Sequence, residues 1–139
     1  MTIAKAQQEI AVRKNELTAM TTHSMRSLGF SALKALHRDS CQRADIWYGQ
    51  LKASDSCRRT VGDAIQSMSR QPGYAGIISD LEKQCSQLKI ESNLAREQLD
   101  IFNQRTGWIR DYIGDNCGIE GWQWRFELMK RSELRSKKH

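Results

Sequence analysis

The sequence is poor in proline, in aromatic residues and in long apolar runs. Only one of the 139 residues is proline, and aromatic residues make up 7% of the chain. The hydrophobic fraction is 39%, below the ~45–50% that is usual when glycine is counted. No run of alternating Val, Ile and Thr is present, so no strand is predicted. This composition disfavours a thick globular core and favours long amphipathic helices, each of which buries one narrow stripe.

Signals for membrane insertion and secretion are missing as well. No segment approaches the ~18 consecutive apolar residues of a membrane span. The N-terminal stretch MTIAKAQQEIAVRKNEL lacks the apolar centre of a secretory signal. The cysteines are widely spaced and form no C-x-x-C pair; they are Cys41, Cys57, Cys85 and Cys117. We therefore expect four free thiols in a cytoplasmic chain, with two disulfides as the alternative that an even count leaves open.

The sequence carries no recognisable catalytic motif. Walker A, G-x-S-x-G and H-E-x-x-H patterns are all absent. His37 and Cys41 stand four residues apart and would share one face of a helix. Their simplest interpretation is a surface histidine beside a small buried thiol, because the remaining histidines and cysteines show no zinc spacing. We therefore expect a protein that is not an enzyme and that binds no metal or cofactor.

The second half of the chain shows a heptad pattern. Apolar or small residues fall alternately three and four positions apart from Ile78 to Ile113. The positions are Ile78, Leu81, Cys85, Leu88, Ser92, Ala95, Leu99, Phe102, Thr106, Ile109 and Ile113. Charged and amide side chains such as Glu82 and Arg96 flank this stripe, as in a coiled coil. The pattern predicts a long helix whose stripe, Leu99 included, is mostly buried.

The first half is helical but less regular. Ile3, Ala6, Ile10, Leu17 and Met20 share one heptad register. A second stripe follows after a shift, through Leu33, Leu36, Ala44, Trp47 and Leu51, and ends in Val61, Ile65 and Met68. Glycines interrupt the pattern, each at a cost of about 1 kcal/mol relative to alanine. We predict a helix over 2–28, a weak point at 28–30 and a second helix over 31–69 with a soft spot near 54–56.

The stretch SRQPGYAGIISDLE marks a turn close to the middle of the chain. It holds the only proline, Pro72, with two glycines beside it. Ser79 followed by Glu82 matches a capping box, which predicts a helix from Ser79 to Ile113. An all-α antiparallel helical hairpin, or coiled coil, results: arm 2–69, turn 70–78 and arm 79–113. In this register, the numbers of paired residues sum to about 148.

The C-terminal part combines glycine, aromatic and basic residues. GDNCGIEG, at 114–121, reads as a flexible joint before a short basic helix over 122–136. That helix offers Trp122 and Trp124 as anchors for a partner. The full predicted docking site is Trp122, Trp124, Arg125, Phe126, Lys130, Arg131 and Arg135. Solvation of a helix end remains the alternative interpretation of these cations.

The charge distribution predicts an acidic partner. The chain carries a formal net charge of +6 and has a pI near 9.4. Nucleic acid is a polyanion that such a chain could bind, but the positive charge is divided between the two ends and no helix-turn-helix, zinc or RNP signature is present. A protein partner is therefore favoured over nucleic acid. The formation of a homo-oligomer stays open as an alternative.

The chain also resembles the FliJ/YscO family, the central-stalk proteins of type III secretion and flagellar export ATPases. The similarity is one of pattern: a Gln/Glu/Arg-rich coil, DLEKQCSQLKIESNLAREQLDIFNQRTGWIRDYI, leads into an aromatic-basic stretch, WQWRFELMKR. It covers roughly 60 residues, and GDNCGIEG interrupts the second arm where the family has a continuous coil. The resemblance implies a cytoplasmic stalk or adaptor that contacts an ATPase hexamer, the export gate and secretion chaperones.

A compact four-helix bundle is the alternative architecture. Its helices would span 2–28, 31–69, 76–114 and 120–136, with breaks at Gly29, Pro72 and the 114–121 joint. Such a chain would be a small inhibitor or accessory protein of phage or plasmid type that binds a protein or nucleic acid. On either architecture the length predicts one domain over 1–139.

Overall fold

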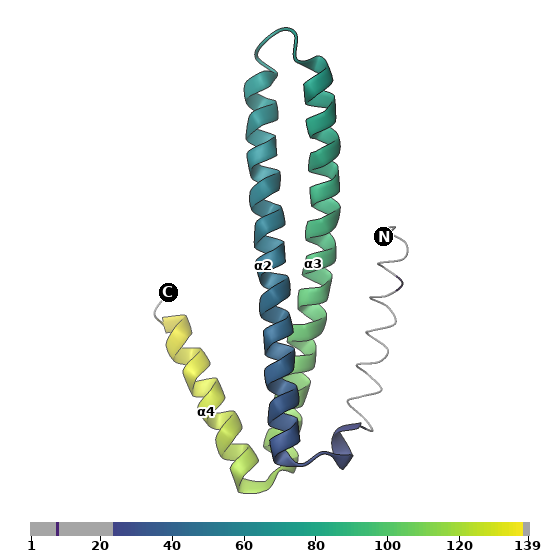
Figure 1. The fold of residues 1–139 in the computed structure, drawn as a ribbon. Coiled ribbons are helices and arrows are strands. Elements are labelled where there is room, and N and C mark those ends of the chain that lie inside the picture. Colours follow the sequence, from purple (N-terminus) through teal and green to yellow (C-terminus); the bar gives the residue numbers. More distant parts are fainter. Residues whose placement is uncertain (1–7, 9–23, 138–139) are drawn as a thin grey trace. The chain divides into compact units, whose positions relative to one another are not determined.

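The computed structural model describes residue 8 and residues 24–137, and the described part of the chain is all-helical, as predicted (Figure 1). A short 3₁₀ helix, η1, spans Ser24–Ser27, and three α-helices follow. They are α2 (Phe30–Met68), α3 (Ala75–Asn116) and α4 (Gly118–Lys137). Most of the predicted helix 2–28 lies outside the described residues. Among the described helices, none has the length and apolarity needed to cross a membrane.

Helix α2 is continuous where the sequence predicted a soft spot. Residues 54–56 are helical, and the helix also runs through Gly49 and Gly62. The side chains that α2 hides follow a regular three-and-four spacing that includes polar residues. His37 is 6% exposed, Ser40 is fully buried and Ser54 is 3% exposed. These polar residues occupy the positions at which the predicted apolar stripe has gaps. The stripe therefore looked interrupted in the sequence, although the helix is continuous.

The turn between α2 and α3 is shorter than predicted. It spans 69–74, with Pro72 outside helix and Gly73 at a φ of +96°, where a side chain would be strained. The first α3 hydrogen bond runs from the Ile78 N–H to the Tyr74 carbonyl, at 2.9 Å. Ser79 therefore lies inside α3, and its predicted role as the capping residue is wrong. The helix begins earlier because residues 75–78 can adopt helical geometry, with Gly76 as the weakest helix former among them.

The predicted α3 stripe is hidden throughout its length. All eleven heptad positions from Ile78 to Ile113 are buried or half-buried. The strongest burial is at the C-terminal end, where Ile109 is 1% exposed and Ile113 is fully enclosed. Leu99 is half-buried rather than enclosed. The spacing of apolar residues thus identified the buried face of α3 correctly.

The chain divides into two units, each of which contains part of α2 and part of α3. One unit contains residues 44–100. The described residues of the other are 24–43 and 101–137, and this second unit contains α4. Both units share the two long helices, so this division does not decide the number of domains. The single domain expected from the sequence stays a prediction.

In the second unit, α2 and α3 run antiparallel and exchange polar contacts. The Ser40 hydroxyl donates to the Phe102 carbonyl at 3.2 Å and lies 2.8 Å from the Thr106 hydroxyl. The residue numbers of these pairs sum to about 144 rather than the predicted 148. The offset is about one helical turn, and α3 likewise begins four residues earlier than predicted.

The same unit contains a cluster of buried apolar side chains. It comprises Met25, Leu33, Ile109 and Ile113, and the side chains packed on it include Phe30, Leu36, Tyr112, Cys117 and Trp124. Met25 belongs to η1 and Trp124 to α4, so the cluster joins all four described elements of the unit. Burial of this apolar surface stabilises the arrangement by about 25 cal/mol per Å².

The joint predicted at 114–121 is a tight corner instead. Helix α3 continues to Asn116, only Cys117 lies outside helix, and α4 begins at Gly118, not at residue 122. Gly118 has a φ of +66°, a conformation that glycine adopts without strain. A side chain at Gly121 would collide with the Ile113 carbonyl and would lie 2.6 Å from the Cys117 Cβ. Glycine therefore lets α4 pass close to the end of α3.

Candidate docking surface on helix α4

One face of α4 is turned towards α2 and α3. Gly121 is buried, and Trp124 and Leu128 are half-buried. The Trp124 ring lies 4.9 Å from the His37 ring of α2, and the two rings are almost perpendicular. Trp124 was predicted to be an anchor for a partner, but here it anchors α4 to its own chain.

Arg125 is likewise engaged within the chain. Its guanidinium lies 3.0 Å from the Asp115 carboxylate and donates to the Asp111 carbonyl at 3.4 Å. Its guanidinium group and the adjoining Cδ cover Gly114, where a Cβ would collide with them. Arg125 therefore ties the start of α4 to the end of α3, and most of its side chain is hidden.

The opposite face of α4 exposes an apolar stripe, which we call the outer stripe. It comprises Ile119, Trp122, Phe126 and Met129, which are 77%, 53%, 53% and 49% exposed. The intervals of three, four and three residues keep them on one side of the helix. The rings of Trp122 and Phe126 stack 5.4 Å apart at 12°. Stacking fixes both rings in place before any partner arrives.

The structure divides the predicted docking residues into three groups. Trp122, Phe126, Lys130 and Arg131 are exposed, whereas Trp124 and Arg125 are turned inward. Arg135 lies in α4, but its side chain is outside the described part of the chain. Ile119 was missed because the sequence placed it in a flexible joint. The three-and-four spacing from 119 to 129 was the signal that could have revealed it.

A groove runs along one side of the outer stripe. Phe30 and Lys34 of α2 form its far wall, and the α4 wall includes Trp122 and Phe126. The Lys34 ammonium lies 4.3 Å from the centre of the Phe30 ring, so its charge is held at the mouth of the groove. Aromatic side chains from both helices thus meet on one exposed surface.

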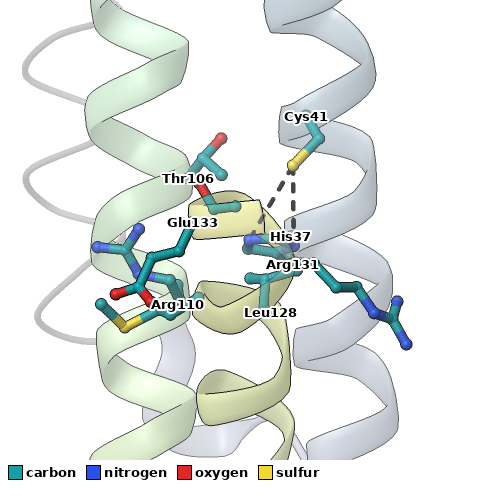
Figure 2. A pocket seen from close by; sticks show the side chains of 9 residues that line it. His37, Cys41, Thr106, Arg110, Leu128, Arg131 and Glu133 are labelled. Atoms are coloured by element: carbon teal, nitrogen blue, oxygen red, sulfur yellow. Dashed lines mark hydrogen bonds between the residues drawn. The ribbon is translucent and has the colours of Figure 1, made fainter. Parts of the chain in front are cut away.

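A cleft of about 410 Å³ opens on the other side of α4 (Figure 2). His37 and Cys41 of α2, Thr106 and Arg110 of α3, and Glu133 of α4 contribute to its lining. The Cys41 sulfur lies 3.8 Å from Nδ1 and 4.0 Å from Nε2 of His37, as long, weak contacts. Burial first, and the nearby Arg110 cation second, lower the pKa of His37.

The His37 ring in this cleft lies close to the Cys41 thiol and to the Arg110 cation. A reactive thiolate is usually stabilised beside an imidazolium, whereas the surroundings of His37 favour the neutral ring. Within the described residues, no group of three or more His, Cys, Asp or Glu side chains is placed to hold a metal ion. The predicted neighbours His37 and Cys41 do meet, but the histidine is the more deeply buried of the two.

Comparisons with protein-family models, with curated proteins and with solved structures found no match to this chain.

Proposed function

We propose that this chain is a non-catalytic helical docking protein, which binds a protein partner through the outer stripe of α4. The observation that carries this proposal is the exposure of Ile119, Trp122, Phe126 and Met129 on one helical face. Two aromatic rings, an aliphatic residue and a methionine at three-and-four spacing form the recognition pattern of a helix that packs against another helix. Their inward neighbours hold α4 in place, so the surface is preorganised.

The occupant that we propose is an amphipathic helix with acidic flanks. Residues 121–139 carry six basic and two acidic side chains, so two copies of this segment would repel each other. Lys34 and Arg131 line the groove together with Glu120 and Glu127, so the net positive charge of residues 121–139, rather than the groove itself, favours a partner of opposite sign. Charge of this kind speeds encounter, whereas the apolar stripe supplies the affinity.

The more specific proposal is that the protein is the stalk or adaptor of a type III secretion ATPase complex. The sequence resemblance to FliJ/YscO proteins supports it, as does the heptad burial along α3. In this proposal α2 and α3 form an antiparallel coiled-coil hairpin in the cytoplasm. The outer stripe then contacts the ATPase hexamer or a secretion chaperone.

A binding measurement with purified export ATPase tests this assignment. The full chain is compared with a double variant, Trp122→Gln with Phe126→Gln, and with a matched control, Ile46→Gln with Ile77→Gln. The control side chains are also exposed apolar residues on helices, but they lie outside α4. We expect the wild type and the control to bind and the double variant to lose at least tenfold in affinity.

The outcomes separate the stalk from other docking functions. Wild-type binding that the double variant retains would remove the outer stripe from the proposal. No binding of the ATPase by the wild type would reject the stalk assignment. Retention of DNA or RNA with a steep salt dependence would instead favour the nucleic-acid accessory protein.

A further inference from the structure

His37 occupies an unusual position at the contact between α2 and α4. It is 6% exposed and sits on the buried stripe of α2, where an apolar residue is expected. Its ring meets Trp124 of α4 at 4.9 Å, and Trp124 packs on the apolar cluster of the unit. The contact between the rings of His37 and Trp124 therefore depends on a titratable side chain.

The groups around His37 oppose a positive charge on its ring. Along the cleft, these groups are Cys41 on α2, Arg110 on α3, and Arg131 and Glu133 on α4. Glu133 is the single carboxylate among these lining residues. Figure 2 shows its carboxylate on the α3 side of the cleft, whereas His37 lies on the α2 side.

Two effects act on the imidazole in the same direction. Burial penalises the charged ring, and Arg110 repels it, so the pKa of His37 lies below its ordinary value. The neutral ring is therefore the form that fits between α2 and α4.

We propose that His37 is a pH-sensitive latch, whose neutral ring holds α4 against α2 and whose protonation releases Trp124 from this contact. The corner between α3 and α4 lies outside the latch. Gly118, Gly121 and the Arg125–Asp115 ion pair hold that corner, and none of them contacts His37 in the geometry described above. Release would therefore tilt α4 about the corner and leave both long helices in place.

Release would enlarge the docking surface. Trp124 follows Trp122 by two residues, so its exposure would add a third aromatic ring next to the outer stripe. This consequence for the partner depends on the proposed function, whereas the latch itself does not. Mild acidification would then change the affinity for the acidic helix in parallel with the exposure of Trp124.

The test follows the tryptophan indole N–H signals of the full chain by NMR between about pH 5 and pH 7.5, the range in which histidine titrates. A Trp124→Phe variant assigns the Trp124 signal. We expect this signal to move as the pH falls, with a midpoint below that of an exposed histidine, and solvent exchange of the Trp124 indole to rise at least tenfold relative to that of the exposed Trp122 indole. His37→Gln should abolish the transition.

Matched controls use the other two histidines, at positions 23 and 139. His23→Gln and His139→Gln should leave the Trp124 transition unchanged. Because His37→Gln could disturb the fold, Arg110→Gln provides a second variant: removal of the cation should raise the midpoint. Circular dichroism confirms that each variant stays helical.

Three results would overturn the latch: a Trp124 signal that does not respond to pH, a transition that persists in the helical His37→Gln chain, or a midpoint that Arg110→Gln leaves in place. Binding to the purified ATPase is measured separately at both ends of the pH range. A transition without binding would reject the stalk assignment alone, and binding without a transition would reject the latch alone.

Discussion

Single side chains in this molecule often break the usual rule that hidden positions are apolar. His37, Ser40, Ser54 and Ser92 are all nearly or fully buried on the facing stripes of α2 and α3. Ser40 has partners across the helix pair, and Ser54 accepts a hydrogen bond from the Gln50 amide at 3.4 Å. Small hydroxyl side chains can fill such positions because they occupy little volume, and Ser92 does so although its hydroxyl has no hydrogen-bond partner among the described residues. This substitution of polar for apolar residues hid the regularity of α2 from sequence analysis.

The enclosed isoleucines of the second unit should contribute most to stability. Ile109 is 1% exposed and belongs to the apolar cluster, whereas Leu99 is only half-buried. We expect Ile109→Ala to lower the free energy of unfolding by about 2–5 kcal/mol, and Leu99→Ala by less. Urea denaturation of the two variants makes the comparison. A larger loss for Leu99→Ala would contradict the assignment of the core.

The thiols should differ in reactivity. None of the four cysteines, which all lie in the described part of the chain, forms a disulfide; Cys57 is exposed, and burial raises the pKa of Cys117. Because the thiolate is the reactive form, Cys117 should be alkylated more slowly than Cys57 at about pH 8. Mass spectrometry after a short iodoacetamide pulse gives the order. Faster modification of Cys117 would show that the corner between α3 and α4 is more open than described.

The titration of His37 should also affect stability. Its pKa is lower in the folded chain than the ordinary value of 6.5, so the unfolded chain binds the proton first as the pH falls. The stabilisation is fully present above about pH 6.5 and is lost as the pH falls through the folded-state pKa. Thermal unfolding between about pH 5 and 7.5 should show this decline in the wild type and a smaller one in His37→Gln. Equal declines in both chains would contradict the assignment of this pH dependence to His37.

At the scale of elements, the sequence predicted helix interiors better than helix ends. The α3 stripe followed from apolar spacing alone, because a buried face needs apolar or small residues at every step. The ends were misplaced for different reasons. Ser79 matches a capping box, but residues 75–78 are equally compatible with helix and extend α3. At the C-terminal end of α3, the glycines of 114–121 predicted a flexible joint, but they instead allow close packing around Cys117.

Glycine substitutions should separate packing from flexibility. A methyl group at Gly121 would collide with the Ile113 carbonyl, whereas at Gly62 nothing lies within 4 Å. We expect Gly121→Ala to destabilise the chain by about 1–3 kcal/mol, because the corner must open. Gly62→Ala, inside α2, should stabilise it by about 0.5–1 kcal/mol. Thermal melting of both variants tests the pair, and stabilisation by Gly121→Ala would favour a loose joint.

At the scale of the whole molecule, the sequence predicted the helical class but not which face of α4 is exposed. Trp122 and Trp124 look equivalent in the sequence. The contact of Trp124 with His37, some 87 positions earlier in the chain, decides that only Trp122 faces outward. Such a contact depends on how α2, α3 and α4 pack together, which local spacing does not encode.

The central claim is that the outer stripe of α4 docks onto an acidic helix of a protein partner. Site-specific photo-crosslinking in the cell of origin tests it most directly, with the crosslinking residue placed at position 122, at position 124 or at the exposed position 46. At neutral pH, we predict that position 122 crosslinks one protein at an acidic helical segment, and that positions 124 and 46 do not. Equal crosslinking from positions 122 and 46, or none from position 122, would contradict the account.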